Sequence, residues 1–364
     1  MIAPVSLAIW AYLSLAHGKF WQSGPQLPAT TPAHHPDVDI VVPARDEAAT
    51  IRAAIVSLLA QDYGGHFRII LVDDNSSDGT AALAGTADNL LVLSLTSKPA
   101  EWSGKLWALS QGVATGNAPV LLFTDADIVH DPRHLSSLVA KLVQGPFDMV
   151  SEMVRLNCQS LAERALVPAF VYFFQMLYPF RRVNDPRSRV AAAAGGTVLI
   201  RRDALQRIGG IESIKNALID DVTLAKSVKK VGRIFLCHSA LAASIRPYPH
   251  FGDIWRMISR TAFTQLRHSA ALLLLTLAAM AAVWWVPVCA ALFGHGLESV
   301  LGLIALVLSA ASYLPTLRSY RRSPLWALAL PFIASFFMAA TAASALDFWR
   351  GRGARWKSRA YGPG

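Results

Sequence analysis

Three apolar runs in the first third of the chain each end in acidic residues. The runs are residues 40–42, 69–72 and 120–123, and the acids that follow them are Asp46, Glu47, Asp73, Asp74, Asp125 and Asp127. Each run is typical of a buried strand, and helix-like stretches separate the runs, so the strands are expected to be parallel. Parallel strands would bring these acids to one edge of a sheet, where open α/β folds bind ligands.

Several carboxylates at one edge repel one another unless a cation joins them. Asp125 and Asp127 stand at alternate positions after a buried strand. This spacing suits one acid binding a hard cation while the other steadies its water or a ribose hydroxyl. A turn in which an aspartate caps the next element is the structural alternative. We therefore expect a divalent cation at Asp125 and Asp127, together with an oxygen-rich, anionic substrate.

Asp73 and Asp74 follow a predicted strand, at the position where a carboxylate binds the nucleoside in dinucleotide-binding folds. A residue of the same loop is also suited to cap the next helix, which is the structural alternative. The glycine-rich phosphate loop of those folds is absent from the sequence. Phosphate charge would then be met by metal and basic side chains, and Lys105 is one candidate. An ordinary solvated lysine at a helix start is its alternative.

A second acidic pair, Asp220 and Asp221, begins a helical stretch that runs to Lys230. Negative charge is favourable at a helix N-terminus, which gives the pair a structural explanation. An acid near an acceptor hydroxyl also acts as a general base by taking its proton. Upstream, Gly195 and Gly196 permit close backbone approach beside a strand, or a bulge.

The composition places part of the chain in a membrane. Of 364 residues, 53% are hydrophobic and 16% charged, with a mean hydropathy of +0.37, too apolar for a purely soluble protein of this size. Residues 272–293, 297–317 and 325–348 are each long enough to cross a bilayer core of about 30 Å. Much of the net charge of +10 lies near these segments rather than in one stripe, so nucleic acid is not an expected partner. The three cysteines indicate neither a disulfide scaffold nor a zinc site.

The predicted organisation has six parts: a membrane anchor (1–18), a linker (19–37), an α/β catalytic domain (38–246), an amphipathic interfacial helix (247–269), transmembrane helices (270–348) and a basic tail (349–364). Residues 251–268 carry apolar side chains on one helical face and arginines on another, which is typical of a helix on a bilayer surface. Basic residues follow both the second and the third span, so positive-inside logic leaves the third span, with its Pro331, either crossing or re-entrant.

The ordered motifs resemble those of family 2 glycosyltransferases with the GT-A fold, over about residues 38–245. The matching residues are Pro43 to Glu47, Asp73 and Asp74, Gly104 and Lys105 with Ala108 and Leu109, Asp125 and Asp127, Gly195 to Thr197 with Arg201 and Arg202, and Asp220 and Asp221 with Leu224. With the anchor before this region and hydrophobic spans after it, the chain is most similar to the membrane-bound, hopanoid-biosynthesis-associated members.

The resemblance implies a Rossmann-like, mostly parallel α/β sheet and an inverting hexosyltransferase. The sugar would pass from a nucleotide-diphosphate sugar to a membrane lipid hydroxyl, in hopanoid or related lipid biosynthesis. The implied site has a base at Asp221 with Asp220 beside it, a metal at Asp125 and Asp127, a diphosphate or acceptor region at Gly196, Thr197 and Arg267, and donor contacts from Pro43, Arg45, Asp46, Glu47, Asp73, Asp74, Lys105 and Asp125. The implied location is a bacterial inner membrane with the catalytic domain facing the cytoplasm.

Two departures and two alternatives qualify the resemblance. The acidic pair usually reads Glu-Asp but is Asp220 and Asp221 here, and only Arg267 is kept from the interfacial motif of processive relatives. One sugar added to a lipid is therefore expected rather than a long polysaccharide. A non-catalytic, membrane-associated partner that binds nucleotide sugars is one alternative. A nucleotidyltransferase is the other, and the acidic, glycine-free residues 43–47 disfavour its triphosphate loop.

Overall fold

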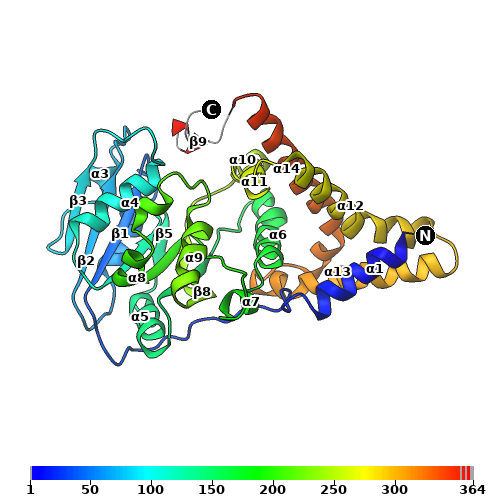
Figure 1. Ribbon diagram of the computed structural model, residues 1–364, viewed down its shortest axis with the longest axis horizontal. Coiled ribbons are helices and arrows are strands. Elements are labelled where there is room, and N and C mark those ends of the chain that lie inside the picture. Colours follow the sequence, from blue (N-terminus) through cyan, green and yellow to red (C-terminus); the bar gives the residue numbers. More distant parts are fainter. Residues whose placement is uncertain (1, 353–354, 357–358, 361–364) are drawn as a thin grey trace. The chain divides into compact units, whose positions relative to one another are not determined.

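The computed structural model describes residues 2–352, 355–356 and 359–360 (Figure 1). These residues fall into two compact units, and each is described by itself. The helical unit contains residues 2–24, 158–181 and 248–352, and the α/β unit contains residues 25–157, 182–247, 355–356 and 359–360. Residues 158–181, predicted as part of the 38–246 domain, thus belong to the helical unit. Part of the predicted basic tail, Lys357 included, lies outside the described residues.

An eight-stranded sheet forms the centre of the α/β unit, in the order β3-β2-β1-β4-β7-β6-β8-β5 (Figure 1). Its strands are β1 (Val38–Ala44), β2 (Phe67–Asp73), β3 (Leu90–Ser94), β4 (Val120–Thr124), β5 (Ile128–His130), β6 (Met149–Arg155), β7 (Thr197–Arg201) and β8 (Ile234–Ser244). The expected parallel pairing of the three acid-ended strands is confirmed, because β1 pairs in parallel with both β2 and β4. β7 runs antiparallel to β4, with Thr197 opposite Thr124.

Helices cover both faces of this sheet because side chains along a strand alternate between the two faces. On one face, Ile40 and Val42 of β1 pack with α2 (Ile51–Leu59) and α5 (His134–Gln144) in a single buried cluster. On the other face, α4 (Gly104–Thr115) packs against β1 and β2. Each fully buried aliphatic side chain contributes about 1.5–3 kcal/mol to such a core.

The edge at the carboxyl ends of β1, β2 and β4 also receives the turn before β7 and the start of α9 (Asp220–Val231). The turn arrives there because β7 begins at the edge where β4 ends. The shorter helices of the unit are α3 (Thr80–Leu83), α8 (Arg202–Arg207) and η1 (Ile211–Ile214). α7 (Phe180–Asn184) lies where the chain passes from one unit to the other, and the short strands β9 (Arg355–Trp356) and β10 (Arg359–Ala360) pair with each other.

Three helices of the helical unit are long and apolar enough to cross a membrane, as predicted. They are α12 (Ala270–Phe293), α13 (Leu297–Ser319) and the segment Pro324–Trp349, which joins η2 (Pro324–Ala329) to α14 (Leu330–Trp349). Pro331 stands in the first turn of α14, where proline is tolerated because the N–H that it lacks has no partner in the helix. It therefore does not interrupt the third helix.

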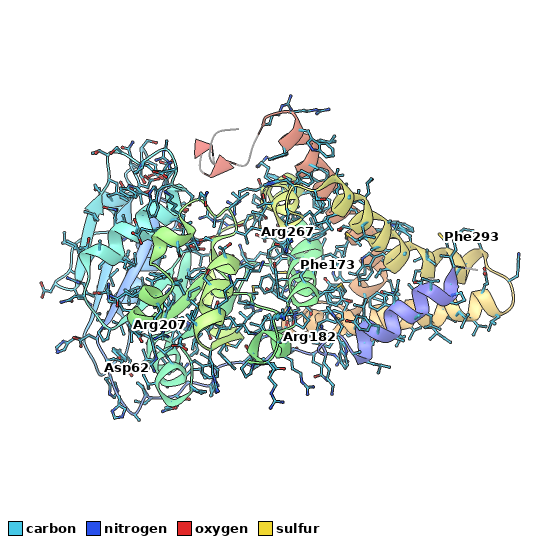
Figure 2. All side chains as sticks on the ribbon, viewed as in Figure 1. Asp62, Phe173, Arg182, Arg207, Arg267 and Phe293 are labelled. Atoms are coloured by element: carbon cyan, nitrogen blue, oxygen red, sulfur yellow. The ribbon has the colours of Figure 1, made fainter. Side chains whose placement is uncertain are left out.

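Two further helices pack against these spans. α1 (Ala3–Leu15) is bound to α12, where the Trp10 indole N–H donates to the Val283 carbonyl at 2.8 Å. α6 (Leu161–Leu177) contacts α13, and the Tyr172 and Ser312 hydroxyls lie 2.6 Å apart. Phe173 of α6, labelled in Figure 2, has its ring centroid 4.7 Å from that of Phe337 in α14. With 13 residues, α1 is shorter than the roughly 20 that a bilayer core requires.

The predicted single helix over residues 251–268 is wrong, because the segment forms two helices. α10 (Phe251–Ser259) ends before Thr261, and α11 (Ala262–Gln265) follows it. The break lets Phe263 turn inward, where its N–H bonds to Ser344 Oγ at 3.1 Å and its side chain is buried. The apolar face of α10 packs on α14 through Trp255 and Phe336. Placement of this segment on a bilayer surface stays a prediction.

Replacing Gly112 by alanine is expected to destabilise the α/β unit. The new Cβ would lie 2.3 Å from Val41 Cγ1 and 3.1 Å from Val72 Cγ2, because α4 approaches the sheet closely there. Overpacking costs about 1–3 kcal/mol, more than the ~0.5–1 kcal/mol that alanine gains over glycine inside a helix. Thermal unfolding in one detergent compares the variant with the wild type.

Gly252→Ala is the matched control, because Gly252 also lies in a helix and its new Cβ would meet Arg256 Nη1 at an ordinary 3.9 Å. This variant should unfold at the wild-type temperature or slightly above it. A Gly112→Ala protein as stable as the wild type would contradict the tight packing of α4.

Candidate active site

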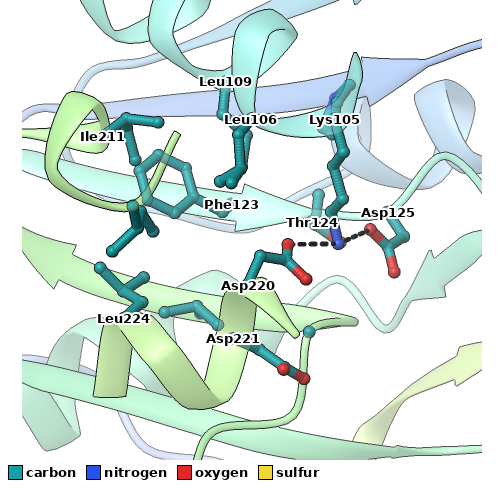
Figure 3. A pocket seen from close by; sticks show the side chains of 14 residues that line it. Lys105, Leu106, Leu109, Phe123, Thr124, Asp125, Ile211, Asp220, Asp221 and Leu224 are labelled. Carbon is teal, nitrogen blue, oxygen red and sulfur yellow. Dashed lines mark ion pairs between the residues drawn. The ribbon is translucent and has the colours of Figure 1, made fainter. Parts of the chain in front are cut away.

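Lys105 joins two of the predicted acids at the edge of the sheet. Its ammonium lies 2.9 Å from Asp125 Oδ1 and 3.3 Å from Asp220 Oδ2 (Figure 3). Lys105 stands in the first turn of α4, whose N-cap Ser103 accepts a hydrogen bond from the Leu106 N–H. Burial alone would lower the pKa of Lys105, but the nearby charges of Asp125, Asp220 and Asp221 outweigh burial and raise it. Lys105 is thus a fixed positive charge rather than an ordinary solvated lysine.

Asp221 lies next to Asp220 at the start of α9. Figure 3 shows the Asp220 carboxylate turned toward Lys105 and the Asp221 carboxylate pointing away from it. Burial and the charge of Asp220 raise the pKa of Asp221 to about 7, although Lys105 and the backbone N–H groups of Val222 and Gly195 favour its charged form. A carboxylate with a pKa near neutrality is suited to accept a proton.

Arg246 joins two other predicted residues of the edge. Its Nε lies 2.8 Å from Asp127 Oδ2, and its Nη2 lies 2.6 Å from Glu47 Oε1. Asp127 also accepts a hydrogen bond from the Ser244 hydroxyl at 3.0 Å. Sequence reasoning missed Arg246, although it lies two residues after the end of β8 and precedes Pro247. A lone basic residue after a strand was the available signal.

The edge therefore carries two cations among its acids. Burial raises the pKa of Asp125, and the nearby charge of Asp127 adds to the rise, although Lys105 opposes it. The order from one end to the other is Glu47, Arg246, Asp127, Asp125, Lys105, Asp220 and Asp221. The structure thus brings together acids that follow β1 and β4 and acids that begin α9. Arg246 lies between Glu47 and Asp127, and Lys105 lies between Asp125 and Asp220.

The loops after β1 and β2 hold the remaining predicted donor residues. Arg45 donates to the Asp74 carbonyl, and its Nη1 lies 3.8 Å from Asp74 Oδ2. Asp46 accepts a hydrogen bond from the Ser77 N–H at 2.9 Å, and Asp73 accepts one from the Ser76 hydroxyl. Asp73 and Asp74 are buried. These contacts bind the two loops to each other, which gives the acids a structural role whether or not a ligand uses them.

A pocket that is partly open to solvent lies at this edge of the sheet. Its polar side is formed by Lys105, Asp125, Asp220 and Asp221, and its apolar side includes Leu106, Phe123 and Ile211 (Figure 3). Pro43 and Gly195 also line it. A Cβ on Gly195 would lie 3.2 Å from Asp221 Oδ2 and 3.4 Å from Lys105 Nζ, so a larger residue would crowd these two side chains.

The other predicted residues are placed differently. Gly196 presents its carbonyl to the Thr124 hydroxyl at 3.0 Å, and the Thr197 hydroxyl donates to the same carbonyl at 2.8 Å. Thr197 is completely buried. Arg267 follows α11 and belongs to the helical unit, so its predicted diphosphate role stays a prediction.

Among the described residues, no group of three or more histidine, cysteine, aspartate or glutamate side chains is arranged to hold a metal ion alone. Asp125 and Asp127, which follow β4 with one residue between them, nevertheless offer hard carboxylate oxygens. Mg²⁺ commonly binds through one or two carboxylates plus substrate phosphates and water. The donor set thus fits a divalent cation that arrives with an anionic substrate.

Residues 39–209 match the family model described as Glycosyl transferase family 2. An N-acetylglucosaminyltransferase of Neorhizobium galegae is 44% identical over 50% of this chain and 42% of its own length. An undecaprenyl-phosphate 4-deoxy-4-formamido-L-arabinose transferase of Aeromonas hydrophila is 28% identical over 32% of this chain and 37% of its own length. The chain covers less than half the length of these curated relatives.

One solved structure extends the comparison to nearly the whole chain. The mannosyltransferase PcManGT from Pyrobaculum calidifontis, in complex with GDP-Man and Mn²⁺, aligns over 94% of this chain and 99% of its own, with a TM-score of 0.56 and 20% identity. This likeness concerns the fold, and it confirms the expected GT-A α/β sheet.

Asp221→Asn is expected to raise the stability of the protein above pH 7. Because the pKa of Asp221 is raised in the folded state, the folded protein binds this proton more tightly than the unfolded chain does. The resulting stabilisation is present below about pH 4 and is lost as the pH rises to about 7. Asparagine stays neutral, so the variant should unfold at a higher temperature than the wild type at pH 8 and at a similar one at pH 4.

Asp203→Asn serves as the control for losing one negative charge, because Asp203 lies on α8 with an exposed side chain. It should not reproduce the gain at pH 8. Equal unfolding temperatures of the wild type and Asp221→Asn at pH 8 would show that burial does not oppose the charge of Asp221.

Proposed function

We propose, from the glycosyltransferase family 2 domain that residues 39–209 form, that this protein transfers one sugar from a nucleotide-diphosphate sugar to the hydroxyl of a membrane lipid. The observation that carries the proposal is the gathering of Asp125, Lys105, Asp220 and Asp221 around one pocket. A basic group, an acid near neutral pKa and a cation-binding pair are the parts that displacement at an anomeric carbon requires.

Asp221 is the proposed general base. Its raised pKa lets it accept the proton of the acceptor hydroxyl as the new glycosidic bond forms. The hydroxyl attacks the anomeric carbon from the face opposite the diphosphate, so the configuration inverts. Asp220 keeps Lys105 in place, and its charge helps to raise the pKa of Asp221. Asp220 is thus an orienting partner rather than a second base.

The donor is proposed to bind along the rest of the edge. Asp46, Glu47, Asp73 and Asp74 are the nucleotide-side acids, with Pro43 and Arg45 completing that wall. Lys105 supplies positive charge toward the diphosphate. Mg²⁺ or Mn²⁺ held by Asp125 and Asp127 would neutralise charge that grows on the leaving diphosphate. Arg246 already pairs with Asp127 and Glu47, so it keeps these two acids from repelling each other when no cation is bound.

The apolar helices of the helical unit are the basis for proposing a lipid acceptor. Three helices are long and apolar enough to span a bilayer, and an enzyme anchored in this way meets apolar acceptors without extracting them into water. One relative is named for transfer involving undecaprenyl phosphate, which is itself a lipid. We propose an integral inner-membrane protein with the α/β unit on the cytoplasmic side, and a hopanoid or a related lipid alcohol as the acceptor.

Comparing membrane lipids with and without the protein tests this function. Cells that make the protein should contain a lipid heavier by one sugar residue, and purified protein in lipid vesicles should form it from a nucleotide-diphosphate sugar. EDTA should stop the transfer, and added Mn²⁺ or Mg²⁺ should restore it. If the protein converts no lipid under any donor, and only free sugars or proteins gain the residue, a lipid acceptor is excluded.

Asp221→Asn is expected to lower kcat by at least about 100-fold, since general bases typically contribute 10²–10⁴-fold. Binding of the nucleoside diphosphate, measured by calorimetry, should stay within a few fold of the wild-type value, because Asp221 acts on the acceptor. Asp203→Asn should keep full activity. Normal transfer by Asp221→Asn would assign the base to another residue.

A further inference from the structure

A chain of polar side chains is buried inside the α/β unit, next to the candidate site. It consists of Thr124 at the end of β4, His130 at the end of β5, His134 at the start of α5, and Glu152 in β6. All four are at most 4% exposed. Thr124 Oγ1 lies 3.2 Å from His130 Nε2, and His130 Nδ1 lies 2.9 Å from His134 Nδ1. His134 Nε2 then contacts Glu152 Oε2.

The proton positions in this chain follow from its end at Thr124. The Thr124 hydroxyl donates to the Gly196 carbonyl at 3.0 Å, so its oxygen accepts from the Nε2–H of His130. Burial lowers the pKa of His130 well below its usual value, and so does the nearby His134. A neutral ring carries one N–H, so Nδ1 of His130 accepts from the Nδ1–H of His134.

Glu152 closes the chain at its other end. Since His134 donates through Nδ1, its contact with Glu152 through Nε2 needs one further proton, carried by the ring or by the carboxyl group. Cys237 Sγ lies 3.8 Å from the second oxygen, Glu152 Oε1, and is placed to donate to it. Burial raises the pKa of this thiol, and so does the charge of Glu152, which keeps the S–H proton in place. Each polar atom named in this series thereby has a hydrogen-bond partner, as is expected of buried polar groups.

Through Thr124, this series of hydrogen bonds ends on the turn that contains Gly195 and Gly196. Ser151, next to Glu152 in β6, accepts from the Ala194 N–H at 2.9 Å and donates to the Ala194 carbonyl at 3.1 Å. Within this turn, the Gly195 N–H donates to the Asp221 carboxylate. The Gly196 carbonyl accepts from Thr124 and, at 3.4 Å, from the backbone N–H of Asp125. Asp221 and Asp125 thus both hydrogen-bond to this one turn, and Thr124 of β4 and Ser151 of β6 bind the same turn.

We propose that His130, His134 and Glu152 are positioning residues, which fix the Gly195–Gly196 turn through the Thr124 hydroxyl and thereby aim the carboxylate of Asp221. This inference rests on the proposed function for its kinetic part. Displacing a catalytic group by about 1 Å can cost 10²-fold in rate. A misaimed base slows turnover and leaves nucleotide binding nearly intact, because the residues proposed to bind the nucleotide do not include Asp221.

Two substitutions of Glu152 test the positioning role. In Glu152→Gln, the amide NH₂ donates to His134 Nε2 while the amide oxygen accepts from Cys237, so the chain persists and kcat should stay within about threefold of wild type. In Glu152→Leu, His134 loses its partner, and kcat should fall at least tenfold while the Kd of the nucleoside diphosphate changes less than threefold. Equal kcat in Glu152→Leu and wild type, or equal losses in both variants, would overturn the proposal.

Asp39→Asn is the matched control for damage to a buried acid. Asp39 is also buried in the sheet and paired with Arg68 and Arg202, but it lies near the amino end of β1. This variant should unfold at a lower temperature and keep its kcat. A loss of kcat in Asp39→Asn equal to that in Glu152→Leu would assign the effect to general destabilisation and overturn the positioning role.

Nitrogen-15 NMR of the full-length wild-type protein, labelled at histidine, shows which ring nitrogen of His130 carries the proton. This test requires neither a folded variant nor transfer activity. His130 should be neutral, with its proton on Nε2, from pH 5 to pH 8. A proton on Nδ1 of His130 would mean that Thr124 donates to the ring instead of to Gly196, which overturns the link to the turn. A wild-type protein that binds nucleotide and has this tautomer, but glycosylates no lipid, would contradict the proposed function and leave the hydrogen-bond chain standing.

Discussion

The ammonium group of Lys105 holds the candidate site together. It lies between Asp125, which follows β4, and Asp220, which begins α9. Without a positive charge at this point, the carboxylates of Asp125, Asp220 and Asp221 would line one pocket with no cation of the protein near them. Arg246 does the same for Asp127 and Glu47 at the other end of the edge. The closely spaced acids of this site therefore depend on two cations that are part of the protein.

The two glycines before β7 connect this charged edge to the interior of the sheet. A Cβ on Gly195 would crowd Asp221 and Lys105, and one on Gly196 would lie 2.9 Å from Val154 Cγ2. The absence of side chains lets the turn touch the carboxylates on one side and the buried strand β6 on the other. A buried polar chain is costly unless every member has a partner. Here the cost is met by a series of hydrogen bonds that ends on the turn itself.

The sequence predicted much of the fold because local patterns carried it. Short apolar runs bounded by acids identified β1, β2 and β4, and long uncharged runs identified the three candidate spans. Other features escaped these patterns. The break between α10 and α11 depends on Phe263 packing inward and on its bond to Ser344. The assignment of α6 to the helical unit likewise depends on contacts with residues far along the chain, such as Ser312.

The sequence by itself determined the three acid-ended strands, the spans and the set of acids expected at the carboxyl edge, since hydrophobic periodicity and residue order are local properties. Only the tertiary structure decided which charges neutralise one another. Arg246 reaches Asp127 and Glu47, and Lys105 reaches Asp220, across long separations in the chain. Coulomb interactions depend on distance in space and on burial, not on separation along the chain. The raised pKa of Asp221 likewise became visible only once the fold buried this carboxylate next to the charge of Asp220.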